Sequence, residues 1–74
     1  MRLFEFTKLN SCYEVNGFIT NTINFLRKSI PTSTDINDIK STIYDDENSQ
    51  QLLACLYRNP SLRPLFLEIK TYLK

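Results

Sequence analysis

The stretch SLRPLFLEIKTYLK, residues 61–74, carries the clearest folding signal in this sequence of 74 residues. Its apolar residues recur at steps of three and four, which places them on one face of a helix. They are Leu62, Leu65, Phe66, Ile69, Tyr72 and Leu73. Pro64 falls in the first turn, where its missing amide proton is tolerated, and Ser61 is the expected N-cap. We therefore predict a C-terminal helix with a buried apolar face.

Residues 11–30 predict a longer helix. Ser11 and Glu14 have the spacing of a capping box. The helix should end before Pro31, because a residue that precedes proline is disfavoured in the α region. The apolar repeat on its buried face is Val15, Phe18, Ile19, Thr22, Ile23, Leu26 and Ile30. Asn16-Gly17, the dipeptide preferred in two-residue hairpin turns, supports a competing interpretation as a β-hairpin.

Two shorter helices are expected between these segments. Thr32, Ser33 and Thr34 are N-cap candidates for the first of them. Its apolar face would carry Ile36, Ile39 and Ile43. Asp46 or Ser49 could cap the second, which should end at Asn59-Pro60. That helix would bury Leu52, Leu53, Cys55 and Leu56.

The N-terminal segment RLFEFTKL, residues 2–9, allows two interpretations. A strand would put Phe4 and Phe6 on one face, but its backbone groups would need a partner strand, for example from a second copy of the chain. We favour a short helix or an extended arm whose Leu3, Phe4 and Phe6 close one end of the core.

These segments together predict an all-α fold, a small bundle of about four short helices with an N-terminal arm. We expect residues 1–74 to form a single small helical domain. With one Gly and three Pro, the sequence has few of the turn residues that an all-β fold needs. The alternative is an α+β fold with an N-terminal hairpin around Asn16-Gly17. A chain of this length buries only about 60% of its surface, so its stability is marginal.

The composition argues against enzymatic chemistry, and we expect no cofactor and no metal. The chain has no His, which removes the commonest general base and metal ligand. A single Gly excludes the glycine-rich phosphate-binding loops. The acidic segment 35–46 has the length of a calcium loop, but Ile39 and Lys40 occupy positions that require an oxygen ligand and Gly. We interpret its carboxylates as helix caps and solubilising charges.

The two cysteines are too few for a disulfide framework, and no leader or long apolar span is present. We therefore expect a cytoplasmic protein with no membrane association. Cys12 and Cys55 are expected to be reduced thiols that behave as small core residues.

The leading functional hypothesis is a small, non-enzymatic accessory protein. We expect a regulator or inhibitor that acts by binding another protein, and that also self-associates as a homo-oligomer. Leu67 interrupts a basic stripe on the polar side of the C-terminal helix, so it is a candidate contact. The candidate partner-binding residues are Leu3, Phe4, Arg63, Leu67, Lys70 and Lys74.

Two other functions are less favoured. A nucleic-acid-binding regulator would use the basic stripe of Arg63, Lys70 and Lys74, together with Arg58. The net charge of +1, however, falls short of the strongly basic surface typical of such proteins. A third hypothesis is an enzyme subunit that supplies helices to another chain's site.

Overall fold

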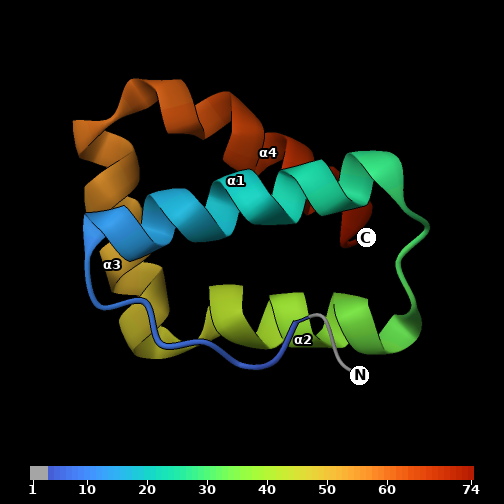
Figure 1. Cartoon of the computed structure of the whole chain (residues 1–74). Coiled ribbons are helices and arrows are strands. Elements are labelled where there is room, and N and C mark those ends of the chain that lie inside the picture. The colour runs from blue at the N-terminus through green and yellow to red at the C-terminus, as the bar shows by residue number, and fades with distance from the viewer. Residues whose placement is uncertain (1–3) are drawn as a thin grey trace.

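The computed structural model describes residues 4–74, which form an all-α bundle behind an N-terminal arm (Figure 1). The predicted small bundle of four helices is therefore confirmed. In this part of the chain the helices are α1 (Cys12–Lys28), α2 (Ser33–Tyr44), α3 (Asp46–Arg58) and α4 (Arg63–Tyr72), with a 3₁₀ turn, η1 (Pro60–Leu62), before α4.

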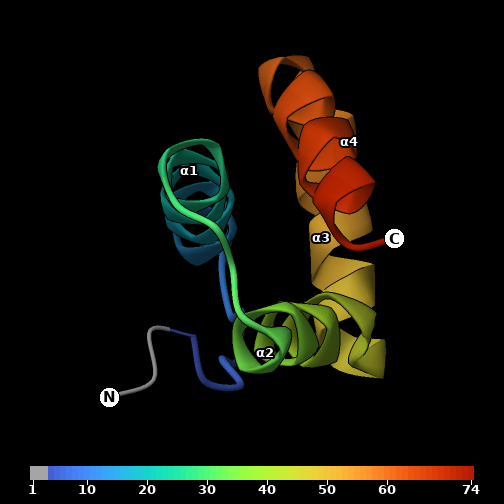
Figure 2. The same ribbon diagram turned by 90° about the vertical axis from the view of Figure 1, so that its right-hand side faces the viewer.

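The long helix α1 is the centre of the bundle. It packs against α4 and α3, and α3 also packs against α2 (Figures 1 and 2). Ile69 of α4 is fully buried and Phe66 packs against the core, as the C-terminal periodicity predicts. The core consists of Leu9, Val15, Ile19, Ile23, Leu26, Ile39, Ile43, Leu52, Cys55, Leu62, Ile69 and Leu73.

Side chains cap three of the helices at their N-termini. Ser11 accepts a hydrogen bond from the amide of Glu14, which confirms one half of the predicted capping box, but Glu14 accepts from the Ser11 hydroxyl instead of its amide. Thr32 forms a complete capping box with Asp35 at the start of α2. The cap of α3 is Asp45, so the expectation of Asp46 or Ser49 was wrong by one residue or more. Each cap satisfies an amide that the helix itself leaves free.

The cap predicted for α4 is wrong. The Ser61 hydroxyl donates to Asn59 Oδ1 instead, and no side chain caps α4. Pro60 and Ser61 lie in η1, which continues directly into Arg63 with helical backbone angles. The turn therefore leads the chain into α4 without an extended N-cap residue.

The hairpin alternative is also wrong, because Asn16-Gly17 lies inside α1. Hydrogen bonds along a continuous helix of 17 residues outweigh the local turn preference of this dipeptide. The predicted burial of Ile30 fails as well, and this side chain is 95% exposed. Ser29 already has an extended backbone, so the helical repeat ends before it reaches Ile30.

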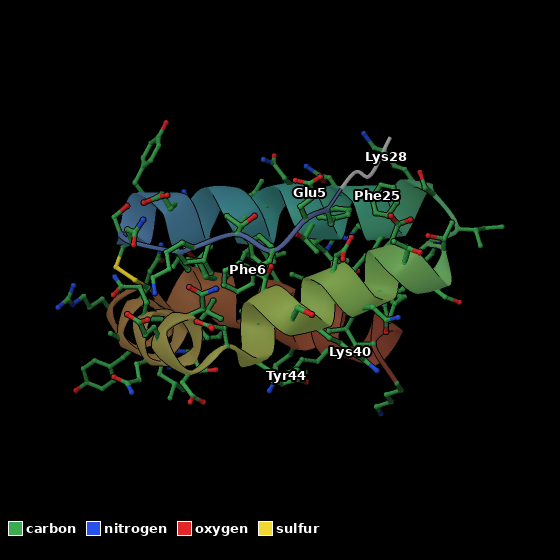
Figure 3. All side chains as sticks on the ribbon, turned by 90° about the horizontal axis from the view of Figure 1, so that it is seen from below. Glu5, Phe6, Phe25, Lys28, Lys40 and Tyr44 are labelled. Atoms are coloured by element: carbon green, nitrogen blue, oxygen red, sulfur yellow. A yellow bond between two sulfur atoms is a disulfide. The ribbon has the colours of Figure 1, made fainter. Side chains whose placement is uncertain are left out.

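The N-terminal arm is extended and lies along the junction of α1 and α2 (Figure 3). The Phe4 ring packs edge-on against Phe25 of α1, with 4.9 Å between the ring centroids. Leu9 is buried in the core, whereas Phe6 is 53% exposed. Phe4 therefore packs against the core as expected, whereas the expectation for Phe6 was wrong, because its side chain is exposed. Leu3 lies outside the described residues.

Asn48, at the start of α3, holds the arm in place. Its fully buried side-chain oxygen accepts a hydrogen bond from Leu9 N–H at 2.8 Å. Its side-chain nitrogen donates to the carbonyl oxygens of Thr7 and Thr42, at 2.7 and 2.9 Å. Thr7 N–H donates to Thr42 Oγ1 beside it. One amide thus joins the arm, the end of α2 and the start of α3.

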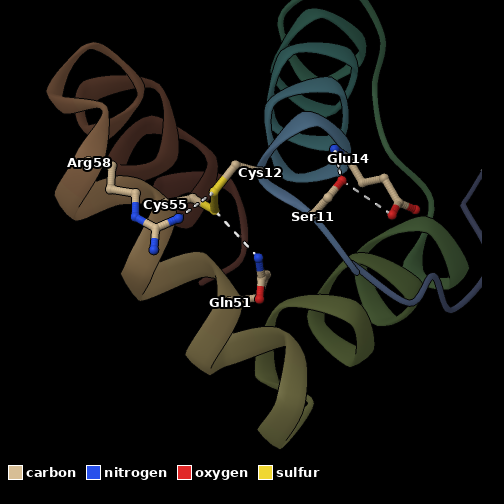
Figure 4. Close-up of a disulfide and its surroundings, with 6 residues drawn as sticks. All are labelled: Ser11, Cys12, Glu14, Gln51, Cys55 and Arg58. Carbon is tan, nitrogen blue, oxygen red and sulfur yellow. Dashed lines mark hydrogen bonds between the residues drawn. A yellow bond between two sulfur atoms is a disulfide. The ribbon is translucent and has the colours of Figure 1, made fainter.

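Cys12 and Cys55 form a disulfide between the start of α1 and the last turns of α3 (Figure 4). The expectation of two reduced thiols was therefore wrong. The two residues are 43 positions apart, but the α1–α3 contact brings their Cα atoms to 5.5 Å. Arg58 Nη1 lies 3.9 Å from Cys12 Sγ on the outer side of the bond.

Replacing Asn48 should destabilise the fold strongly. Asn48→Ala leaves the Leu9 amide and two carbonyl oxygens without partners, and each unsatisfied buried group costs about 1–3 kcal/mol. We expect the free energy of unfolding to fall by about 2–4 kcal/mol in urea denaturation. Asn16→Ala, on the exposed side of α1, is the control and should change it by less than about 0.5 kcal/mol. Equal effects of the two substitutions would contradict this role of Asn48.

Removing the disulfide should also lower the stability. A closed loop of this length restricts the unfolded chain, which corresponds to roughly 3–4 kcal/mol. The Cys12→Ala/Cys55→Ala protein and the reduced native protein should both unfold at lower urea concentration than the oxidised protein. An unchanged midpoint in both would show that the bond does not stabilise this fold.

Candidate functional site

An apolar groove of about 200 Å³ lies between α3 and α4, next to the end of α2. It exists because α3 and α4 diverge from the turn η1 while α1 packs against both (Figures 1 and 2). Leu53 was expected in the core, but it lies at this groove and is 69% exposed. The groove is lined by Ile43, Tyr44, Ser49, Leu52, Leu53, Leu56, Phe66 and Lys70.

One exposed stripe on each helix extends the groove into a wider surface, which we call the α3–α4 face. The residues of each stripe follow one another at helical spacing, so they share one side of their helix. The α3 stripe consists of Asp46, Gln50, Leu53 and Tyr57. The α4 stripe consists of Arg63, Leu67 and Lys70, together with Lys74, which follows the last helical residue, Tyr72. Leu53 and Lys70 line the groove itself, one from each stripe.

The α3–α4 face carries large apolar side chains that reach solvent. Tyr57 is 81% exposed, Leu67 is 63% exposed and Tyr44 is 57% exposed. Figure 3 shows Tyr44 at the end of α2, projecting away from the arm. Single exposed apolar residues are ordinary, but a group of them around an apolar groove is typical of a binding surface.

Two cations of the α4 stripe have contacts within the chain. Arg63 donates from Nε to the carbonyl of Leu56 at 2.8 Å and from Nη2 to that of Tyr57 at 3.0 Å. It therefore caps the C-terminus of α3, where the helix dipole favours positive charge. Lys70 Nζ lies 5.1 Å from the centre of the Phe66 ring, at the edge of the groove.

An ion pair on another side of α4 fixes the orientation of this stripe. Arg27 of α1 donates two hydrogen bonds to Glu68, at 2.9 and 2.7 Å. These hydrogen bonds hold the pKa of Glu68 below its ordinary value of 4.5, and they raise the pKa of Arg27. Because Glu68 faces α1, Leu67 and Lys70 are directed away from it.

The structure brings together only part of the predicted binding surface. Arg63, Leu67 and Lys70 share one side of α4, as their spacing predicts, whereas Lys74 lies beyond the end of the helix at Tyr72. Phe4 lies on the arm, which runs below α1 on the side away from α4 (Figure 2). Its ring is engaged with Phe25, so we do not include it in the α3–α4 face. Leu3 lies outside the described residues.

A second, shallower hollow of about 680 Å³ lies between the arm and α1. Its lining is mostly uncharged, with Phe4 and Phe18 beside amide and hydroxyl side chains such as Asn16 and Asn21. The fully buried Thr22 hydroxyl has no hydrogen-bond partner within residues 4–74. Glu14 is the one ionisable carboxylate of this lining, so the hollow holds no carboxylate pair.

The acidic residues are mainly structural. Asp35 and Asp45 act in helix caps, and Glu47 pairs with Lys8 of the arm at 2.6 Å. Within residues 4–74, no group of three metal-binding side chains gathers at one place. None of the helices in the described part is long and apolar enough to span a bilayer.

Comparison with protein families, with curated proteins and with solved structures finds no match to this chain. Its function is therefore argued from its own surface.

Replacing Arg63 should lower stability, because its guanidinium caps α3. We expect Arg63→Gln to reduce the free energy of unfolding by about 1 kcal/mol, the usual net contribution of a hydrogen bond. Lys74→Gln, at the other end of the same stripe, should change it by less than about 0.5 kcal/mol. Urea denaturation measures both. If the two variants are equally stable, Arg63 does not act as a cap.

Proposed function

We propose that this protein is a non-enzymatic regulator or inhibitor that acts by binding another protein through the α3–α4 face. The observation that supports this most directly is the group of exposed apolar side chains around one apolar groove. Leu53, Tyr57 and Leu67 contribute little to the core of their own chain, and their exposure to water is unfavourable. Covering them with a partner would remove that cost.

The charges of the face define the partner's chemistry. Lys70 and Lys74 leave positive charge along α4, and the groove between the helices is apolar. An amphipathic helix with apolar residues on one side and carboxylates along their edge would match both features. We therefore propose such a helix, presented on the surface of a folded protein, as the bound element.

A protein partner is favoured over nucleic acid by the contacts of the basic stripe. Two donor groups of Arg63 already form hydrogen bonds with carbonyl oxygens of α3. Lys70 of the stripe also borders the apolar groove. Nucleic-acid affinity comes mainly from cations that neutralise phosphates, so this arrangement is a poor match.

The cytoplasmic location expected from the sequence is not part of this proposal. It was based on the low cysteine count and on the lack of a leader or long apolar span, and the Cys12–Cys55 bond does not fit the reduced thiols expected with it. Disulfides persist mainly in oxidising compartments.

Photo-crosslinking from defined positions tests the proposal. A benzophenone-bearing phenylalanine placed at position 53 should form adducts with another protein in extract of the source cells. The same probe at position 24, on the exposed side of α1, should not. We expect the adducts to map to an acidic, amphipathic helix and to decrease at least tenfold in a Lys70→Glu/Lys74→Glu background.

Two results would count against it. Equal labelling from positions 53 and 24 would show that the α3–α4 face is not a specific contact. Adducts with this chain alone, and with no other protein, would show that the face serves self-association only.

A further inference from the structure

The α3 stripe combines a carboxylate with exposed apolar side chains, which are the features proposed for the partner of the α3–α4 face. The α3 stripe is an exposed helical surface with a carboxylate at its start, Asp46, and with Leu53 and Tyr57 further along. The α4 stripe is basic and has one exposed apolar residue, Leu67. The two stripes are therefore complementary in charge, and each also offers an apolar contact.

We infer that the α3–α4 face binds a second copy of the chain in a twofold dimer, with α4 of each protomer packed antiparallel against α3 of the other. This inference concerns the same face as the proposed function but does not depend on it. The bound partner here is a second copy of the chain, whereas in the proposed function it is a different protein.

The course of the chain makes this packing geometrically consistent. The chain runs along α3 toward η1 and then away from η1 along α4, so the two helices diverge from that turn (Figure 1). A twofold axis along the groove places α4 of one protomer over α3 of its partner, and α3 over α4 at the same time. The interface is then isologous, and every contact occurs twice.

The spacing of the two stripes gives a single antiparallel register. Leu67 meets the partner's Leu53 in the middle of each helix pair. Lys74 then meets the partner's Asp46 at one end, and Arg63 meets the partner's Tyr57 at the other. The first contact is apolar, the second is an ion pair, and the third is a cation above an aromatic ring. Between these contacts, Lys70 meets the partner's Gln50, and this pair brings no like charges together.

The other symmetric arrangement is disfavoured by charge. A twofold axis across the groove would place each α4 against the α4 of the partner. Arg63, Lys70 and Lys74 would then face the same three cations, and like charges at contact distance are repulsive. Charge therefore selects the arrangement in which α4 covers α3.

Charge reversal in analytical ultracentrifugation tests this register. The native chain should sediment as a concentration-dependent monomer–dimer mixture. Asp46→Lys and Lys74→Glu should each raise the dissociation constant at least tenfold, because each creates two like-charge contacts. The double variant Asp46→Lys/Lys74→Glu restores opposite charges across the interface, so its dissociation constant should return to within about threefold of the native value.

Glu47→Lys is the matched control. It makes the same charge change in the same turn of α3, but Glu47 faces the arm, where it pairs with Lys8. It should leave the dissociation constant within about twofold of the native value. Circular dichroism establishes that each variant retains its helices, so that a loss of association is not confused with unfolding.

Three results would overturn the dimer. They are a strict monomer at all concentrations, a double variant that associates no better than the single variants, and a Glu47→Lys effect equal to that of Asp46→Lys. None of them bears on the proposed function, because adducts from position 53 with a different protein would still support it. Adducts with no protein at all would count against both.

Discussion

The fold depends on one buried polar group, the side-chain amide of Asn48. Asn48 is the point at which an extended arm, the end of α2 and the start of α3 meet. An extended segment that lies alone against helices has no strand to satisfy its backbone, and unsatisfied buried backbone groups are costly. The Asn48 amide supplies a donor and an acceptor, as a neighbouring strand would. Leu9 can therefore enter the core.

The sequence predicted the helices well, because their apolar residues repeat with a helical period and their caps are local. It did not predict which of two adjacent leucines faces inward. Leu52 and Leu53 differ by about 100° around α3, and the packing of α3 buries Leu52 while it leaves Leu53 exposed. Asn48 was missed because an asparagine in a helical segment usually lies at the surface. Cys12 and Cys55 were left unpaired because sequence spacing does not determine tertiary contact.

The sequence therefore predicted the α4 half of the α3–α4 face but not its α3 half. The spacing of Arg63, Leu67 and Lys70 was sufficient to place them on one side of α4, which ends before Lys74. The α3 half depends on the exposure of Leu53, which follows from how α3 docks on α1 and α2. Periodicity describes one helix at a time, whereas a groove is a property of two helices and the angle between them.

The Cys12–Cys55 bond also has a mechanical consequence. It closes residues 12–55 into a covalent ring, and the arm and α4 are the two tails that leave it. A pulling force applied to the two ends of the chain would be carried by the bond between the sulfur atoms rather than by the helices between them. The tails would extend first, and all of α1, all of α2 and α3 as far as Cys55 would be shielded from tension. Under load, the α3–α4 face would be lost before the ring that supports it.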